Sequence, residues 1–256
     1  MLLILNMKKN LPVLLILSLL VVLSCKKEYN EEKIKLNYSS YTLTADETVQ
    51  LTITEGNSNE IRWSSENEFV ASVSENGLVT GLHVGSTVIR AEEGYCEIIV
   101  TPKYSYYQEP STAWGTSIEN IISIYGLPNN KIVDNNVASI YYANDNFYSP
   151  LTGYFFILNK LEISTVLFPV EQIEKLAEFL NERYQLVYVS DDPDMLAVYV
   201  DGFPTAWTTG ICVNLASNEE YFWVDYYQLD QEEAKSHTEI ATRIRQLRKN
   251  LNYSLE

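Results

Sequence analysis

The sequence predicts a small all-β sandwich over residues 34–102, an α+β domain over residues 104–230 and a helix over residues 231–256. In the first region, short alternating strands are separated by turn residues about every ten positions. In the second region, a helical pattern followed by strands occurs twice. The chain of 256 residues also has 19 tyrosines but only 10 glycines and 8 prolines. This composition favours sheet, because aromatic side chains suit a half-buried pleated surface.

Alternation of apolar and polar residues defines the predicted strands of the sandwich. In "YTLTADETVQLTITE", the side chains of Leu43, Val49, Leu51 and Ile53 are predicted to fall on one face, on either side of a turn. The stretch "NGLVTGLHVGSTVIRA", residues 76–91, predicts two consecutive hairpins, because Asn-Gly suits a tight turn with positive φ. Strands and turns at this spacing are typical of a small β-sandwich.

Five motifs follow one another through this region: Trp63-Ser64-Ser65, Val70-Ala71-Ser72-Val73, Gly77-Leu78-Val79-Thr80-Gly81, Gly85-Ser86-Thr87 and Ile98-Ile99-Val100-Thr101. In this combination, residues 34–102 resemble a bacterial Ig-like group 2 domain, the module of intimin- and invasin-type adhesins. The sequence departs from the family at Leu82-His83, where small or charged residues are more usual. The resemblance implies an Ig-like sandwich that acts as a stiff, surface-displayed spacer or adhesive unit without catalysis.

The second domain is predicted to be a duplicated unit of one helix and an antiparallel meander. Thr116 is predicted to cap the helix in "GTSIENIISIYGLP", with Glu119 reaching back, while Gly126 and Pro128 end it. A second helix is predicted over residues 170–184. "ASIYYAN" and "LTGYFFIL" align with "LAVYVDG" and "TTGICVNL", so the two halves form one α+β layer with the helices on one face. The predicted strands are residues 137–144, 152–159, 162–168, 185–190, 195–201, 208–216 and 220–229.

The first helix of this domain also carries a resemblance. "GTSIENIISIYGLP" is similar to the repeats of small envelope lipoproteins in outer-membrane assembly and to β-lactamase-inhibitor-like repeats. The similarity covers about one helix and carries no binding residue across. After the domain, apolar residues at a spacing of three to four predict the C-terminal helical tail. These residues are Ile240, Ile244, Leu247 and Leu251.

Residues 1–24 are predicted to be a lipoprotein signal peptide. A pair of lysines precedes an apolar run over residues 11–23, which is too short for a comfortable membrane span. The sequence "VLSC" resembles the lipobox of bacterial lipoproteins, which implies that Cys25 carries a lipid and that residues 25–33 form a tether. The alternative is an ordinary cleaved signal peptide. We expect a lipid-anchored protein of the bacterial outer membrane, facing either the periplasm or the outside.

Charge and residue types exclude several functions. The formal net charge is −16, so nucleic acid is not an expected partner, because its phosphates would be repelled. The chain has two histidines, no glycine-rich phosphate loop and no paired-cysteine spacing, so we predict no cofactor, no metal site and no nucleophilic triad. Cys96 and Cys212 fall in different predicted domains, and we do not expect a disulfide between them.

Acidic and aromatic side chains remain as candidates in the second domain. Asp191, Asp192 and Asp194 offer oxygen ligands for Ca²⁺, but the loop lacks the glycine and glutamate of a calcium loop, which favours a solvated turn. Most aromatic residues belong in a core, whereas exposed ones would stack on sugars or anchor a protein partner. The candidate binding aromatics are Tyr154, Trp207, Trp223 and Tyr227.

Two classes of function are consistent with these features. The first is a non-enzymatic, membrane-anchored binding or adhesion protein, in which the Ig-like module is a spacer and the second domain recognises a protein or glycan. The alternative is a hydrolase of envelope or host glycans that uses Asp191, Asp194 or Asp225. That reaction needs two carboxyl groups facing each other across a cleft. Because residue types that carry catalysis are scarce, the sequence favours the binding protein.

Overall fold

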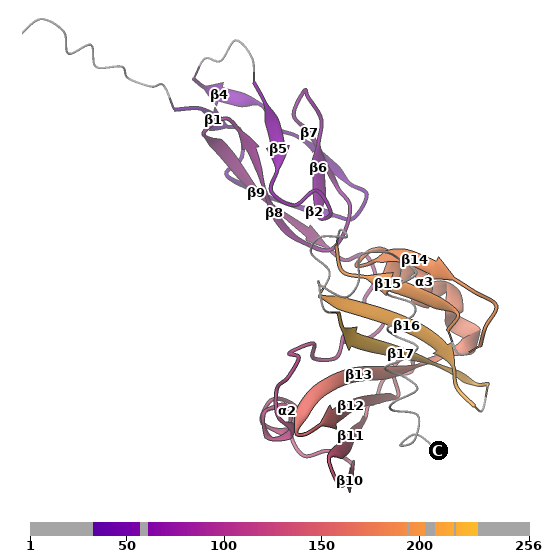
Figure 1. The fold of residues 1–256 in the computed structure, drawn as a ribbon. Helices are drawn as coiled ribbons and strands as arrows, with labels where there is room; N and C mark the ends of the chain where they lie inside the picture. Colours follow the sequence, from indigo (N-terminus) through magenta and orange to yellow (C-terminus); the bar gives the residue numbers. More distant parts are fainter. Residues whose placement is uncertain (1–32, 57–60, 194, 203–207, 218, 230–256) are drawn as a thin grey trace, which may run out of the picture.

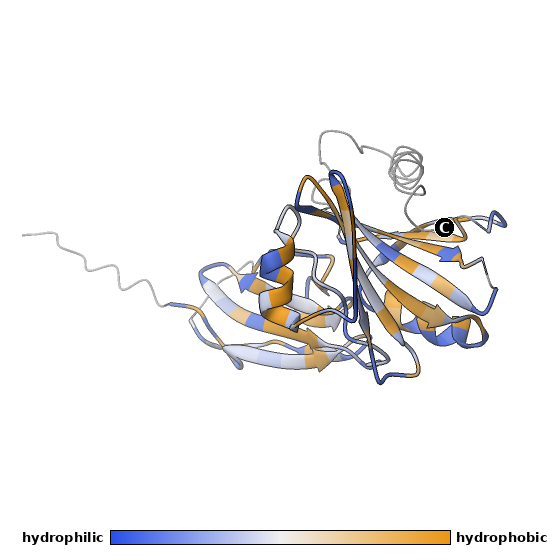
Figure 2. Ribbon diagram, turned by 90° about the horizontal axis from the view of Figure 1, so that it is seen from below, coloured by the Kyte–Doolittle hydropathy of each residue, from blue (hydrophilic) through white to orange (hydrophobic). Residues whose placement is uncertain are grey.

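The computed structural model describes residues 33–56, 61–193, 195–202, 208–217 and 219–229. Strands β1 to β9 form an N-terminal sandwich, and two helices with strands β10 to β17 form a C-terminal domain that follows it (Figure 1). Apolar residues are concentrated on the strands, and hydrophilic residues on the turns (Figure 2). The predicted signal peptide, Cys25, Trp207 and the C-terminal helical tail lie outside the described residues.

The sandwich consists of a four-stranded sheet in the order β2-β9-β8-β5 and a three-stranded sheet in the order β3-β7-β6, with β1 and β4 paired at one end. Its strands are β1 Lys35–Leu36, β2 Ser40–Thr44, β3 Thr48–Gln50, β4 Ile53–Glu55, β5 Trp63–Ser65, β6 Ala71–Val73, β7 Leu78–Gly81, β8 Gly85–Ala91 and β9 Gly94–Thr101. Alternating residues from both sheets fill the core between them, as in other sandwiches. Buried core residues include Leu43, Leu51, Val79, Ile89 and Ile98.

Residues 76–91 do not form the two consecutive hairpins that the sequence predicts. Strands β6 and β7 do form a hairpin, and Gly77 takes the positive φ of 80° that its turn requires. However, β7 pairs with β3 and β6, whereas β8 pairs with β5 and β9, so the chain crosses between the two sheets. The N–H groups of Leu82 and His83 donate to the carbonyl of Val70, at 2.8 and 3.2 Å, and therefore cannot start a ladder from β7 to β8.

The C-terminal domain is one antiparallel sheet of eight strands in the order β10-β11-β12-β13-β17-β16-β15-β14. Its first half is α2 Ile118–Tyr125, β10 Asn130–Asp134, β11 Val137–Ala143, β12 Leu151–Ile157 and β13 Lys160–Pro169. Its second half is the 3-10 turn η1 Val170–Gln172, α3 Ile173–Asn181, β14 Gln185–Val189, β15 Ala197–Val200, β16 Thr209–Leu215 and β17 Tyr221–Gln228. Each half is a helix followed by a four-stranded meander, and the last strands of the halves pair at the centre.

The domain is mostly β, so the α+β class gives the helices too much weight. The helices have only eight and nine residues, and the sheet contains a strand, β10, that the sequence did not predict. The N-cap of α2 is Ser117 and not Thr116. Ser117 has the extended backbone of a cap, and its hydroxyl accepts a hydrogen bond from the N–H of Asn120 at 3.3 Å. Gly126, at a φ of 85°, ends the helix as predicted.

Both helices cover the same face of the large sheet. Cross-strand partners share a face, and one row of partners crosses six strands. This row is Ile140, Tyr154, Ser164, Tyr226, Ile211 and Tyr199. Ile121 of α2 packs in the cluster at one end of the row, and Leu176 and Phe179 of α3 pack in the cluster at the other end.

The connector that leaves the sandwich, residues 104–117, runs over this face between the two helices. The Tyr107 hydroxyl lies 2.8 Å from the Tyr226 hydroxyl beneath it, and both side chains are buried. The Ser164 hydroxyl donates to the carbonyl of Ser111 at 2.5 Å. These bonds fix the connector on the sheet, so its residues form part of the surface of the domain.

A buried glutamate, Glu182, joins the two domains just after α3. Its carboxylate accepts hydrogen bonds from the N–H groups of Lys103 and Tyr104, at 2.9 and 3.1 Å. Its backbone carbonyl accepts from the N–H of Val84 at 2.8 Å. The neighbouring Arg183 donates to the carbonyl of Tyr104 at 2.9 Å. Hydrogen bonds therefore hold the connection between the two domains, which is not a free linker.

Candidate ligand-binding site

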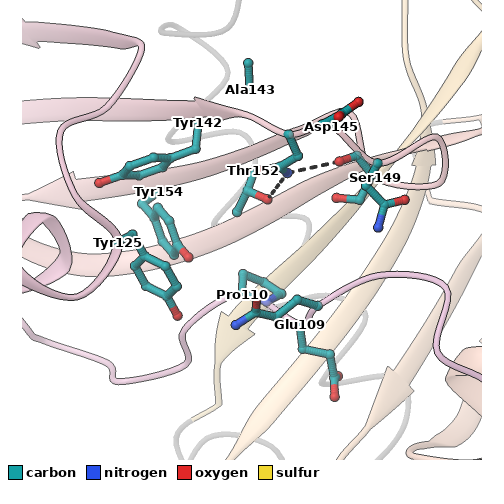
Figure 3. A pocket seen from close by; sticks show the side chains of 12 residues that line it. Glu109, Pro110, Tyr125, Tyr142, Ala143, Asp145, Ser149, Thr152 and Tyr154 are labelled. Carbon is teal, nitrogen blue, oxygen red and sulfur yellow. Dashed lines mark hydrogen bonds between the residues drawn. The ribbon is translucent and has the colours of Figure 1, made fainter.

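A pocket of about 440 Å³ opens on the helix-bearing face of the C-terminal domain. Its volume lies in the range of about 300–1,000 Å³ that is usual for small-molecule sites. The end of α2 and strands β11 and β12 form one wall, the loop between these two strands forms another, and connector residues 108–110 form the rim (Figure 3). The pocket thus combines elements from four separate segments of the first half and the connector.

Three tyrosines form the aromatic wall. Tyr125 ends α2, while Tyr142 and Tyr154 point to the helix-bearing face from β11 and β12 (Figure 3). The rings of Tyr125 and Tyr154 are stacked with centroids 5.6 Å apart, and Tyr142 meets Tyr154 edge to face at 6.0 Å. Tyr154 is buried, whereas 36% of Tyr125 is exposed. The buried ring therefore supports two more accessible ones, and a ligand would meet Tyr125 and Tyr142 first.

The hydroxyls of Tyr142 and Tyr154 remain protonated at neutral pH. Burial raises the pKa of Tyr154 far above its ordinary value, and burial also raises the pKa of Tyr142. The Tyr142 hydroxyl donates to the carbonyl of Gly126 at 2.9 Å, which holds its ring against the end of α2. These two residues therefore present neutral aromatic rings rather than phenolates.

The opposite side of the pocket is polar. Asn144 donates from its side-chain amide to the carbonyl of Ser149 at 3.0 Å and to the hydroxyl oxygen of Thr152 at 2.9 Å (Figure 3). Asn146 donates to the carbonyl of Tyr106 at 3.1 Å and so ties the loop to the connector. Because Thr152 accepts the Asn144 amide proton, its own hydroxyl proton is directed to another acceptor. The loop is thus held in place with polar groups left for a ligand.

The charge of the pocket is negative. Among the described residues that line it, Glu109 and Asp145 are acidic and none is basic. Glu109 already accepts a hydrogen bond from the Tyr184 hydroxyl and lies 3.4 Å from Nε of Arg183, whereas Asp145 is an exposed residue of the β11–β12 loop. The site therefore disfavours anions and accommodates neutral or cationic groups.

A second cavity, of about 620 Å³, lies where the sandwich meets the C-terminal domain. Its ionic groups serve the structure. Arg183 contacts Glu109 and Glu182, and Asp201 accepts hydrogen bonds from the N–H groups of Thr208 and Thr209, at 2.8 and 2.7 Å. Since Arg183 is engaged in the joint and Asp201 in bonds within its own domain, the tyrosine-walled pocket is the better candidate for a site.

The structure separates the aromatic residues that the sequence singled out. Tyr154 lies in the pocket, but Trp223 and Tyr227 point to the opposite face of the sheet, because they alternate with the helix-facing residues of β17. Tyr125 and Tyr142 complete the wall, but they were not selected from the sequence as binding residues. The sequence did contain signals for both. Tyr125 belongs to the predicted apolar face of its helix, and alternation along the strand places Tyr142 on the same face as Ile140.

The acids of the hydrolase hypothesis also lie apart. Asp225 is buried on the face opposite the pocket and accepts hydrogen bonds from Thr165 at 2.6 Å, from Asn214 at 2.8 Å and from Tyr227 at 3.2 Å. Asp191 lies in the exposed turn between β14 and β15. Asp194 falls outside the described residues. The described carboxylates among these candidates thus occupy different parts of the domain.

Metal ligands and thiols are the other groups that could carry chemistry. Within the part of the chain that the structure describes, no group of three or more His, Cys, Asp or Glu side chains is arranged to hold a metal ion. Cys96 and Cys212 are reduced thiols, buried in separate domains. Burial raises the pKa of the Cys96 thiol to about 11, which keeps it protonated and unreactive at neutral pH.

Comparison with known families decides the nature of the first domain. Residues 32–94 match the bacterial Ig-like domain (group 2) family. The N-terminal sandwich belongs to this family. The match ends at Gly94, the first residue of β9, while this closing strand of the Ig-like domain continues to Thr101. No curated protein matches the chain. No helix in the described ranges is long and apolar enough to cross a membrane.

Proposed function

We propose that this chain is a non-enzymatic binding protein of the bacterial cell envelope, anchored in the outer membrane by a lipid on Cys25. The Ig-like domain acts as a spacer, and the C-terminal domain recognises a protein or glycan ligand. The observation that carries this proposal is the open, tyrosine-walled pocket in a domain that a buried glutamate attaches to a group 2 Ig-like module.

The Ig-like module and the joint both support a display role. Group 2 Ig-like domains occur in bacterial surface proteins, which fits an adhesion-type module. The hydrogen bonds from Lys103 and Tyr104 to Glu182 restrict the motion of the second domain relative to the first. A recognition domain that is already fixed loses less conformational freedom when it binds, so more of the contact energy appears as affinity.

The lipid anchor rests on the sequence "VLSC" at residues 22–25. Cells that express the chain would be labelled with a fatty-acid analogue and compared with cells that express Cys25→Ala. We expect label and membrane association for the wild type and neither for the variant. Equal labelling of the two proteins would show that Cys25 does not carry the lipid.

The binding role is tested with the full-length chain in mild detergent, applied to an array of glycans and to solubilised envelope proteins. We expect retention of a ligand without chemical change, and loss of retention for Tyr125→Ala. Cleavage of a glycan by the purified chain would overturn the non-enzymatic assignment. Binding that Tyr125→Ala leaves unchanged would place the recognition surface elsewhere.

A further inference from the structure

We propose that the tyrosine-walled pocket binds the end of an uncharged glycan, with one pyranose ring against Tyr125 and Tyr142 and its hydroxyl groups on Asp145 and Thr152. This inference rests on the proposed binding function and names its ligand class.

The aromatic wall fits the carbon face of a sugar. An aromatic ring carries negative charge on its face, which attracts the slightly positive C–H groups that line one side of a pyranose. Tyr125 and Tyr142 offer two partly accessible rings tilted by 57° with centroids 6.1 Å apart. Tyr154 fixes both from behind, so the wall is formed before the ligand arrives. A preformed wall lowers the entropic cost of binding a flexible saccharide.

The polar side of the pocket fits vicinal hydroxyl groups. The Asp145 carboxylate is exposed and has two oxygen atoms that can accept from two neighbouring sugar hydroxyls. The Thr152 hydroxyl accepts the Asn144 amide at 2.9 Å, so its proton is directed to a sugar oxygen. A purely apolar ligand would displace water from these groups without replacing its hydrogen bonds, which is unfavourable.

The charge of the pocket selects against acidic ligands. Asp145 and Glu109 are both on the lining, and the described lining has no basic residue. The nearby guanidinium of Arg183 is held by Glu109, Glu182 and the carbonyl of Tyr104, so it remains part of the joint. A phosphate, a sialic acid or a uronic acid would therefore meet the Asp145 carboxylate and the Arg183-bound Glu109, with no basic residue on the described lining to pair with it. The volume of about 440 Å³ suits a ligand of one or two rings.

The experiment is titration calorimetry on the full-length chain in mild detergent, with a fixed panel of soluble probes. Uncharged probes are cellobiose, maltose, lactose and diacetylchitobiose. Charged probes are digalacturonic acid and a tetralysine peptide. We expect at least one uncharged disaccharide to bind, with neither charged probe binding more tightly. Loss of one stacking ring is expected to weaken binding about tenfold, so Tyr125→Ala should raise Kd by about that factor.

Matched variants separate stacking from folding. Tyr125→Phe keeps the ring and should recover most of the affinity that Tyr125→Ala loses, while Asp145→Asn should weaken binding without removing the wall. Tyr95 is a 60% exposed tyrosine in the Ig-like domain, and Tyr95→Ala should leave Kd unchanged. If Tyr125→Ala binds a disaccharide as tightly as Tyr95→Ala does, the assignment of the sugar to this wall is wrong.

The remaining outcomes distinguish the ligand class from the binding role. Tighter binding of digalacturonic acid or tetralysine than of every neutral sugar would overturn the uncharged-glycan assignment and leave a binding protein. Binding of no disaccharide, with an envelope protein retained by the same preparation, would do the same. If neither a saccharide nor an envelope protein is retained, the glycan inference and the proposed function both fail.

Discussion

Glu182 provides a direct test of how the two domains are held together. Its side chain is only 5% exposed, and it accepts hydrogen bonds from the N–H groups of Lys103 and Tyr104, at 2.9 and 3.1 Å. Glu182→Ala removes two hydrogen bonds to a charged acceptor, each of which contributes about 1.5 kcal/mol or more. We therefore expect the free energy needed to open the 103–104 segment to fall by about 3 kcal/mol.

Trypsin cleavage after Lys103 measures this opening. Before cleavage, the segment must leave Glu182, and the Lys103 ammonium must leave Asp46, whose carboxylate oxygen lies 2.8 Å from Nζ. When opening is fast relative to cleavage, the cleavage rate follows the population of the open segment. A loss of about 3 kcal/mol then corresponds to cleavage roughly 100-fold faster than in the wild type.

Two variants provide the comparison. Glu174→Ala removes an exposed glutamate from α3, the helix that ends just before Glu182, and should be cleaved after Lys103 at the wild-type rate. Glu182→Gln keeps the size and one acceptor oxygen, so its rate should fall between those of wild type and Glu182→Ala. If Glu182→Ala is cleaved no faster than Glu174→Ala, the Glu182 carboxylate does not hold residues 103–104, and the interpretation of a fixed joint is wrong.

Three further changes test other parts of the structure. Gly77→Ala adds a Cβ at a φ of 80°, only 2.7 Å from the Trp63 ring, so the Ig-like domain should lose about 1–3 kcal/mol of stability, and an unchanged thermal midpoint would contradict the turn. Tyr107→Phe removes the partner of the buried Tyr226 hydroxyl and should cost about 1–2 kcal/mol in urea unfolding, whereas an unchanged midpoint would argue against the pair. The Cys96 pKa is raised from 9.0 to about 11 in the folded state, so its contribution to stability is complete below pH 9 and is lost as the pH rises toward 11. The stability difference between wild type and Cys96→Ala should accordingly narrow over that interval, and a constant difference would refute burial of the thiol.

The core of the Ig-like domain could be predicted because it depends on local alternation. Leu43, Val49, Leu51 and Ile53 were placed on one face. The first three are buried, at 3%, 8% and 1% exposure, whereas Ile53, at the start of β4, is only partly buried. The crossing between the sheets after β7 could not be predicted in the same way. It depends on which distant strands pair with β7 and β8, and a window of neighbouring residues does not contain that information.

The missed strand β10 has a physical explanation. All five of its residues, Asn130–Asp134, are exposed, so the segment shows no alternation between buried and exposed positions. The duplication contained the missing signal, since β14 follows α3 in the second half just as β10 follows α2 in the first.

The sequence alignment of the two halves also needs a shift of one residue. That alignment places Ile140 over Val198. In the sheet, Ile140 pairs with Tyr154 and Tyr199 pairs with Ile211, so Tyr199 is the equivalent of Ile140. Val198 points to the other face, because a shift of one residue along a strand reverses the side chain's direction.

The pocket was only partly predictable. Tyr154 was a candidate from composition, while Trp223 and Tyr227 were candidates of the same kind that the sheet places on its other face. Aromatic content alone does not distinguish these positions. The pairing of β11 with β12 brings Tyr142 to Tyr154, and the docking of α2 on these strands brings Tyr125. The helix docking is a tertiary contact that a window of neighbouring residues does not reveal.

The duplication also shows that the fold does not require the aromatic wall. In the second half, the strand registers place Asp201 where the first half has Tyr142, and Ile211 where it has Tyr154. That half forms the same helix and meander without these two tyrosines.

The two equivalent positions have different surroundings. Around Asp201, residues of the Ig-like domain close over the surface, and the cavity there includes Phe69 and Val84 of that domain. Around Tyr142, no described residue of the Ig-like domain lines the pocket. One half of the repeat therefore holds the neighbouring domain, and the other keeps three tyrosines around an accessible pocket. Since the second half folds without tyrosines at the positions of Tyr142 and Tyr154, the fold itself does not require these two tyrosines, which is consistent with the proposed binding role.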